Sequence, residues 1–319
     1  MPERIEQQAV VSEEQHGMRF DQVAAELFPD YSRSRLQSWI RAGTLTLDEK
    51  SARPRDKVSG GAVLRLCAEL EEEVSWEGEE IALDICYEDE DIIVLDKPAG
   101  LVVHPAAGHR QGTLVNALLH HDPRLSQLPR AGIVHRLDKD TSGLMVVARS
   151  LRAHTDLVSQ LQDRTVKREY VAVCIGSLTG GGTVDAAIGR HPRQRQKMAV
   201  LEHGGKAAVS HYRLRERFGH HTAIDVRLET GRTHQIRVHM AHLHYPLIGD
   251  PQYGGRPRIP AGAAPELVQA LREFPRQALH ARALGLYHPA DGEYREWEVP
   301  LAADLEALLV CLREHDPWR

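Results

Sequence analysis

The sequence AGIVHRLDKDTSGLMVVA, residues 131–148, consists of two apolar runs around a polar joint. The runs at 131–134 and 144–148 predict short buried strands, and the Thr-Ser-Gly triplet between them supplies turn residues. Asp138 stands in the joint between two basic residues, so we expect its carboxylate at a strand end, facing a cleft. The alternative is a turn-forming aspartate that bonds to its own backbone, which is common beside Ser and Gly.

Length and composition indicate an ordinary globular protein. The chain has 319 residues, of which 42% are apolar, and this is enough for two domains and a sizeable core. The first eight residues carry charges without an apolar stretch behind them, and no run approaches membrane-spanning length, so we expect a cytoplasmic protein. The four cysteines form no Cys-x-x-Cys pair, which argues against a disulfide framework or a zinc ribbon.

The formal net charge of -5 is unevenly distributed. Residues 69–91 hold twelve Asp or Glu and no Lys or Arg, so the rest of the chain carries a net charge of +7. Residues 31–68 have eight basic residues against three acidic ones, and residues 92–319 have thirty against twenty-three. Concentrated basic surface suits phosphate binding, and incidental surface charge is the alternative. The acidic stretch is predicted to be a linker.

The N-terminal part predicts a small domain at residues 17–75, after a flexible segment at 1–16. Apolar spacing gives a helix at 20–28 closed by Pro29, and a second helix from an N-cap at Ser32 to Gly43. Short strands are expected at 44–47 and 63–67, separated by a basic loop. Two helices followed by a small sheet, with arginines beside the second helix, resemble the S4 RNA-binding fold. One departure is Asp48-Glu49 in place of an Asn-Gly turn, which weakens the tight-turn prediction.

Residues 76–319 predict an α+β domain with a mixed, largely antiparallel sheet and a central cleft. The helices are expected at 114–121, 152–164 and 302–314. The strands are expected at 92–95, 166–175, 222–228, 278–288 and 294–299.

Two further segments contain residues suited to chemistry. In the strand around Tyr170, alternation puts this ring on the face opposite Val171 and Val173, where it can border a cleft; a core tyrosine is the alternative. The segment 229–240 begins a helix on which Arg237 lies off the apolar stripe, free to hold a carboxylate or a phosphate; a surface salt bridge is the alternative.

Histidines at 234, 239, 242 and 244 raise a metal hydrolase as a rival function. Their spacing fits no zincin pattern, and no Cys or acidic ligand stands beside them. We therefore expect no metal site.

Together these segments resemble the family of pseudouridine synthases that modify ribosomal and transfer RNA and carry an N-terminal S4 domain. The likeness covers nearly the whole chain, and long motifs in one order are specific. It rests on residues 31–36, 87–93, 101–105, 131–143, 229–242, 249–258 and 276–281.

The resemblance implies a role for each candidate residue of the site. Asp138 is the catalytic aspartate, Tyr170 the active-site tyrosine and Arg237 the arginine that pairs with Asp138, while Asp140 is a turn residue. Isomerisation of uridine moves the ribose bond from N1 to C5 without redox change, so no cofactor is expected. The aspartate attacks either the ribose carbon or the uracil ring, and the sequence leaves both routes open.

The target uridine must leave its stack to reach this carboxylate. His135 and Arg136 are expected to contact the everted nucleotide or to fill its place. Further RNA contacts are expected from Arg33, Arg35, Arg41, Lys97, His104, Arg190, Arg193, Arg195, Lys197, Arg232, His234 and Gln235.

The resemblance also implies a substrate. This is 23S rRNA, with several uridines of the stem-loop called helix 69, in free rRNA or in an assembling large subunit (pre-50S particle). The alternatives are transfer RNA, another rRNA site, or a non-catalytic RNA-binding assembly factor, which an S4-like domain alone would permit. We expect a monomer that uses no membrane and no small-molecule cofactor.

Overall fold

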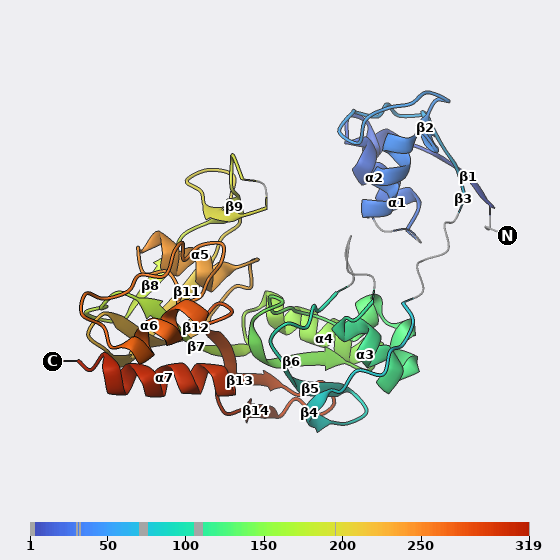
Figure 1. Ribbon diagram of the computed structural model, residues 1–319. Helices are drawn as coiled ribbons and strands as arrows, with labels where there is room; N and C mark the ends of the chain where they lie inside the picture. The colour runs from blue at the N-terminus through green and yellow to red at the C-terminus, as the bar shows by residue number, and fades with distance from the viewer. Residues whose placement is uncertain are drawn as a thin grey trace. The chain divides into compact units, whose positions relative to one another are not determined.

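The computed structural model describes residues 4–29, 31, 33–69, 76–104, 111–194 and 196–318. The chain divides into two compact units, residues 1–75 and 76–319 (Figure 1). Within the described ranges, no helix has the length and apolar character needed to cross a bilayer.

The first unit packs two helices against a three-stranded sheet. Helices α1 (Phe20–Leu27) and α2 (Arg33–Ala42) lie where the sequence predicts them, and Gly43 ends α2 with a φ of 77°. The predicted cap Ser32 is outside the described residues. The antiparallel sheet has the order β1-β3-β2, with strands β1 (Arg4–Val10), β2 (Leu45–Leu47) and β3 (Val63–Glu69).

Two details of this unit differ from the sequence expectation. The N-terminal segment is not a free arm over residues 4–10, because β1 pairs with β3 along its whole length. It was missed because β1 is a half-buried edge strand whose inward positions include only Ile5 and Ala9 as apolar residues. The turn at Asp48-Glu49 forms although it lacks Asn-Gly: both residues have positive φ, and the Asp48 carboxylate accepts the Val63 N–H at 2.8 Å.

In the described part of the second unit, nine strands form one sheet with β14 paired to β13. The order of the other strands is β4-β5-β6-β13-β7-β12-β11-β8, and β6 with β13 is the one parallel pair among them. The bounds are β4 (Asp84–Glu88), β5 (Ile92–Lys97), β6 (Ser142–Ala148), β7 (Lys167–Ile175), β8 (Gly182–Asp185), β11 (Val209–Arg217), β12 (His221–Leu228), β13 (Leu279–Tyr287) and β14 (Tyr294–Glu298). Strands β9 (Ile188–Arg190) and β10 (Met198–Val200) form a separate ribbon.

Helices cover both faces of this sheet. On one face, β7 contributes Tyr170 to the apolar cluster that also holds Ile236 of α5. On the other face, β7 contributes Val173 to a cluster with Leu267 of α6 and Leu305 of α7. The helices are α3 (Leu114–His121), α4 (Leu151–Gln162), α5 (Gln235–His242), α6 (Pro265–Glu273) and α7 (Ala303–His315).

Two expectations for the second unit are wrong. Residues 131–134 are not a strand: a 3-10 turn, η3 (Pro129–Gly132), occupies the first half of the run, and Ile133 makes a single bridge to Val147. The reason is that Arg130 and Ala131 adopt left-handed backbone angles, which no extended strand tolerates. The acidic segment 69–91 is not entirely a linker, because its end forms β4 at the edge of the sheet.

Candidate active site

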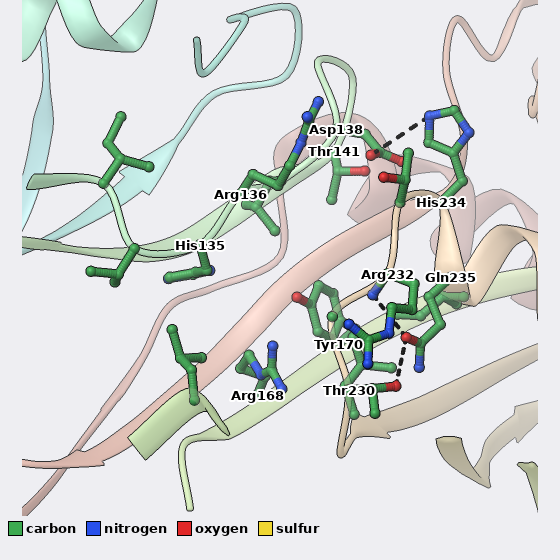
Figure 2. Close-up of a pocket in the computed structure, with 18 of the residues that line it drawn as sticks. His135, Arg136, Asp138, Thr141, Arg168, Tyr170, Thr230, Arg232, His234 and Gln235 are labelled. Atoms are coloured by element: carbon green, nitrogen blue, oxygen red, sulfur yellow. Dashed lines mark hydrogen bonds and ion pairs between the residues drawn. The ribbon is translucent and has the colours of Figure 1, made fainter. Parts of the chain in front are cut away.

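A cavity of about 870 Å³ opens beside β7, and all three residues predicted to be catalytic line it (Figure 2). The sheet order explains how they meet. Asp138 lies in the turn before β6, Tyr170 lies on β7 two strands away across β13, and Arg237 lies on α5, which follows β12 beside β7. A cleft is therefore present where the sequence predicts it, at the N-terminal end of β6, next to the turn that holds Asp138.

Asp138 is held by Arg237. The Arg237 Nη1 donates to the Asp138 carboxylate at 3.0 Å, while its Nε and Nη2 donate to the Asp250 carboxylate at 2.7 and 2.9 Å. The guanidinium also lies 5.1 Å from the centre of the Tyr253 ring. Arg237 is thus fixed by one carboxylate and offers its remaining edge to the other.

Electrostatics keep Arg237 and Asp250 ionised. Burial alone would lower the pKa of Arg237, but the charges and hydrogen bonds of Asp250 and Asp138 outweigh it and raise that pKa. Burial would likewise raise the pKa of Asp250, but the bonds from Arg237 lower it. The guanidinium of Arg237 is therefore a fixed cation 3.0 Å from the Asp138 carboxylate.

Tyr170 also lines the cavity. Its side chain is almost buried, and its hydroxyl makes no hydrogen bond to another described residue. Burial raises the pKa of this phenol, and the charge of Asp138 acts in the same direction. Tyr170 therefore stays protonated at neutral pH, which suits a ring that stacks on a base better than a phenolate that abstracts a proton.

His234 begins α5 with a left-handed backbone, at φ 57°. Its Nε2 lies 3.8 Å from the Asp138 carboxylate and its Nδ1 lies 2.8 Å from the Tyr253 hydroxyl. Burial lowers the pKa of His234, although the charge of Asp138 opposes the shift. The ring is thus a neutral neighbour of the carboxylate.

Three other predicted contact residues also border the cavity. Arg136 is exposed there. His135 accepts the Val146 N–H through Nε2 at 3.1 Å, and burial lowers its pKa to about 3, so it anchors the turn as a neutral ring. His104 lies 6.3 Å from the Trp76 ring, and burial followed by repulsion from Arg130 and Arg136 lowers its pKa to about 4.

Two residues predicted to contact RNA are buried and bonded within the protein. Lys97 is fully buried, and its ammonium donates to the carbonyls of Pro98, Leu101 and Lys139 at 2.6, 3.0 and 2.9 Å, so it holds the Asp138 turn. Gln235 is also buried: its amide oxygen accepts from the Thr230 hydroxyl and the Arg232 N–H, and its amide nitrogen donates to β11. An alternating pattern cannot distinguish such residues from surface ones, because their burial also depends on distant segments, such as the Lys139 carbonyl for Lys97 and the Val209 carbonyl for Gln235.

Arg232 also lines the cavity, and its Nε donates to the Ala207 carbonyl. Arg193 and Lys197 lie between β9 and β10, Arg190 ends β9, and Arg195 is outside the described residues. In the first unit, Arg33 pairs with the buried Asp21 at 2.8 Å, Arg41 donates to Gln37 at 3.2 Å and Arg35 lies over the Trp39 ring.

The four histidines considered as metal ligands do not converge. His239 is buried, with its ring nitrogens next to the Ser210 hydroxyl and the Ala186 carbonyl, whereas His234 lines the cavity. Over the described ranges, no group of three or more His, Cys, Asp or Glu side chains is placed to hold a metal ion.

Sequence reasoning missed two residues of the site. Asp250 lies in the segment 249–258, which contributes to the family resemblance, but no role was predicted for it. In the structure its carboxylate accepts two N–H groups of Arg237. Arg168 lines the cavity on the same strand as Tyr170. Its position two residues earlier, hence on the same face, was the available signal.

Comparison with known proteins agrees with this geometry. The chain matches the family described as RNA pseudouridylate synthase over residues 91–242 and the S4 domain over residues 18–64. It is 62% identical over 314 residues to the "Ribosomal large subunit pseudouridine synthase D" of Pseudomonas aeruginosa, covering 98% of both chains. It is 57% identical over 307 residues to the protein of that name from Xanthomonas campestris pv. campestris, covering 96% of this chain and 92% of that one.

A solved structure shows the same likeness. "Human RNA Pseudouridylate Synthase Domain Containing 1" matches with a TM-score of 0.56 at 25% identity, covering 76% of this chain and 91% of that one. The chain therefore belongs to the RNA pseudouridylate synthase family, and it is a pseudouridine synthase that carries an S4 domain.

Proposed function

We propose that the protein isomerises uridine to pseudouridine in 23S rRNA, with several uridines of the helix 69 stem-loop as targets, and that Asp138 is the nucleophile. The observation that carries the chemistry is the Asp138 carboxylate, which faces the cavity and accepts a hydrogen bond from Arg237 at 3.0 Å. The substrate is supported by the two bacterial relatives, which are named as large-subunit enzymes and match nearly their whole length.

The reaction conserves atoms. In the ribose route, a carboxylate oxygen bonds to C1′ while the bond from C1′ to N1 breaks, and the uracil ring leaves with the electron pair. The ring then turns, C5 bonds to C1′ and displaces the carboxylate, C5 loses its proton and N1 gains one. In the uracil route, the carboxylate adds to a carbon of the ring instead, the bond from C1′ to N1 breaks and C5 bonds to C1′; the carboxylate then leaves the ring, C5 loses its proton and N1 gains one. Both routes start from a carboxylate oxygen of Asp138, a group that the hydrogen bond from Arg237 orients.

The cavity is large enough for an everted nucleotide. A volume of about 870 Å³ lies within the range of small-molecule sites, and an enzyme that acts on a stacked base must expose it first. The exposed Arg136 borders the opening, where it can contact the everted nucleotide or replace it in the stack. We assign residues 17–75 and the β9–β10 loop to RNA backbone binding, in a monomer that acts in the cytoplasm on rRNA or on a pre-50S particle.

The test of the nucleophile compares two aspartates of the same turn. Asp138→Asn should abolish pseudouridine formation while leaving RNA affinity within about threefold, because one charged oxygen is lost from a large interface. Asp140→Asn is the matched control and should keep its activity, since the Asp140 carbonyl, not its carboxylate, contacts Arg276. An active Asp138→Asn protein would overturn the assignment.

The test of the substrate maps pseudouridine in total RNA from cells that lack the protein. We expect pseudouridine to disappear from helix 69 and to return when the wild-type chain, but not Asp138→Asn, is supplied. An unaltered helix 69 would reject the target, and losses confined to transfer RNA would identify that RNA as the substrate.

A further inference from the structure

Arg168 has no part in the reaction described above, yet it forms the wall of the same cavity. It lies on β7 two residues before Tyr170, so both side chains are on one face of the strand. Figure 2 shows its guanidinium beside the Tyr170 ring, on the side of the cavity where His135 lies. Only 6% of Arg168 is exposed.

The charge of Arg168 is not balanced by the protein. Among the described residues, no carboxylate lies within ion-pair distance of its guanidinium; Nη2 donates to the Glu229 carbonyl at 3.1 Å, and Nε has no partner. By contrast, the equally buried Arg237 and Arg276 each hold a carboxylate through two N–H groups. A buried guanidinium stays protonated, so a missing counter-charge costs free energy in the empty protein.

The residues around Arg168 leave space beside its guanidinium. A Cβ at Gly231 would lie 2.8 Å from Nη1 of Arg168, so the glycine leaves room that any other residue would reduce. Burial lowers the pKa of Arg168, and the nearby Arg232 adds to that effect. A cation without a counter-charge on the wall of a substrate cavity is arranged to bind negative charge on the substrate.

We propose that Arg168 is a substrate-contacting residue whose guanidinium binds a negatively charged oxygen of the everted target nucleotide. This rests on the proposed function. The oxygen has two possible sources. One is a phosphate of the target nucleotide, which is charged from the start. The other is a uracil carbonyl oxygen, which gains charge when the ring leaves C1′ with the electron pair; a base stacked on Tyr170 lies beside Arg168.

The experiment compares Arg168→Met and Arg168→Lys with the wild type. Lys167→Gln is the matched control, because Lys167 lies next along the strand on its opposite face and pairs with Glu296 at 2.7 Å. Three quantities are measured for each protein: the single-turnover rate with saturating enzyme, the RNA dissociation constant at several salt concentrations, and the melting temperature.

Two results would support the proposal and distinguish the sources. A rate reduced at least 100-fold in Arg168→Met, with affinity within twofold, identifies the uracil oxygen. An affinity reduced at least tenfold, with a salt slope smaller by about one, identifies a phosphate. In both cases Arg168→Met should melt no lower than the wild type, because it removes a buried charge that lacks a partner.

Two other results would overturn the proposal. One is a rate and an affinity that both stay within twofold of the wild type in Arg168→Met. The other is a melting temperature lowered by several degrees, with activity and stability restored together by Arg168→Lys, which would make the residue structural.

The RNA in this experiment is total RNA from cells that lack the protein, so that the substrate is tested separately. If the wild type modifies transfer RNA but not 23S rRNA, the proposed target fails, while the Arg168 comparison proceeds on the RNA that is modified.

Discussion

Replacing Asp250 by Asn tests whether the ion pair between Asp250 and Arg237 is needed to position Arg237 beside Asp138. Asp250 accepts Nε and Nη2 of Arg237, and its side chain is fully buried. Asn keeps the size of the side chain but loses its charge and can accept only one of these two bonds. The guanidinium then has Asp138 as its remaining carboxylate, and we expect it to rotate toward that carboxylate and pull it from its working position.

The size of the effect follows from this geometry. Breaking a buried ion pair by removing one partner costs about 3–5 kcal/mol of stability, and the surviving bond to Asp138 places Asp250→Asn toward the lower limit. A shift of about 1 Å in a reacting group can reduce a rate about 100-fold. We therefore expect a rate lowered by about two orders of magnitude, and RNA affinity within threefold because Asp250 is buried away from RNA.

The assay is single-turnover pseudouridine formation at a temperature well below the melting temperature, combined with RNA binding. Asp122→Asn is the matched control: Asp122 is also buried and accepts Nη2 of Arg149 at 2.8 Å, but it does not line the cavity. It should lose stability and keep its rate. If Asp250→Asn retains a rate within threefold of the wild type, Asp250 does not position Arg237 and the reasoning is refuted.

Three further predictions concern the same region. Burial lowers the pKa of Lys97 from 10.5 to about 8, so between these pH values the unfolded chain binds more protons than the folded one. The free energy of unfolding should therefore rise with pH across this range, by about 3 kcal/mol more in the wild type than in Lys97→Met. Parallel curves of unfolding free energy against pH for the two proteins would contradict this. Tyr170→Phe removes a hydroxyl without a described partner and should change the single-turnover rate less than tenfold; a 1000-fold loss would show that the hydroxyl takes part in proton transfer. Gly143→Ala should lower the melting temperature sharply, because φ is 114° and a Cβ would collide with the Ala281 backbone; an unchanged melting curve would count against the tight β6–β13 junction.

The sequence predicted the elements that have a strong local pattern. Helix α3 and strand β12 lie within one residue of their expected bounds. Their buried apolar residues recur at the spacing typical of a helix or a strand, which the sequence shows directly. Strand β1 was missed because an edge strand needs few apolar residues. The run at 131–134 was assigned wrongly because its apolar residues pack into the core from a turn.

In the site, too, residues within long motifs were predicted, and residues whose role depends on distant contacts were not. Asp138 and Arg237 were found because their motifs are long, and the structure places them 3.0 Å apart. The role of Lys97 could not be read from the sequence, since a lysine that bonds to backbone carbonyls looks like a lysine that binds phosphate. Its burial depends on the packing of segments about forty residues apart, which no local pattern records.

The turn that carries Asp138 is held mainly through its backbone. Lys97 binds the Lys139 carbonyl from one side, and Arg276 donates to the Asp140 carbonyl at 3.2 Å while Asp304 fixes its other N–H groups. Buried cations thus hold the backbone carbonyls of the turn, while the Asp138 carboxylate is contacted by Arg237 at 3.0 Å and by His234 at 3.8 Å. Asp138, the proposed nucleophile, is therefore positioned mainly through backbone carbonyls of its turn rather than through its own carboxylate oxygens. This arrangement also explains why the side chain of Asp140 is dispensable in the proposed mechanism, although its carbonyl is not.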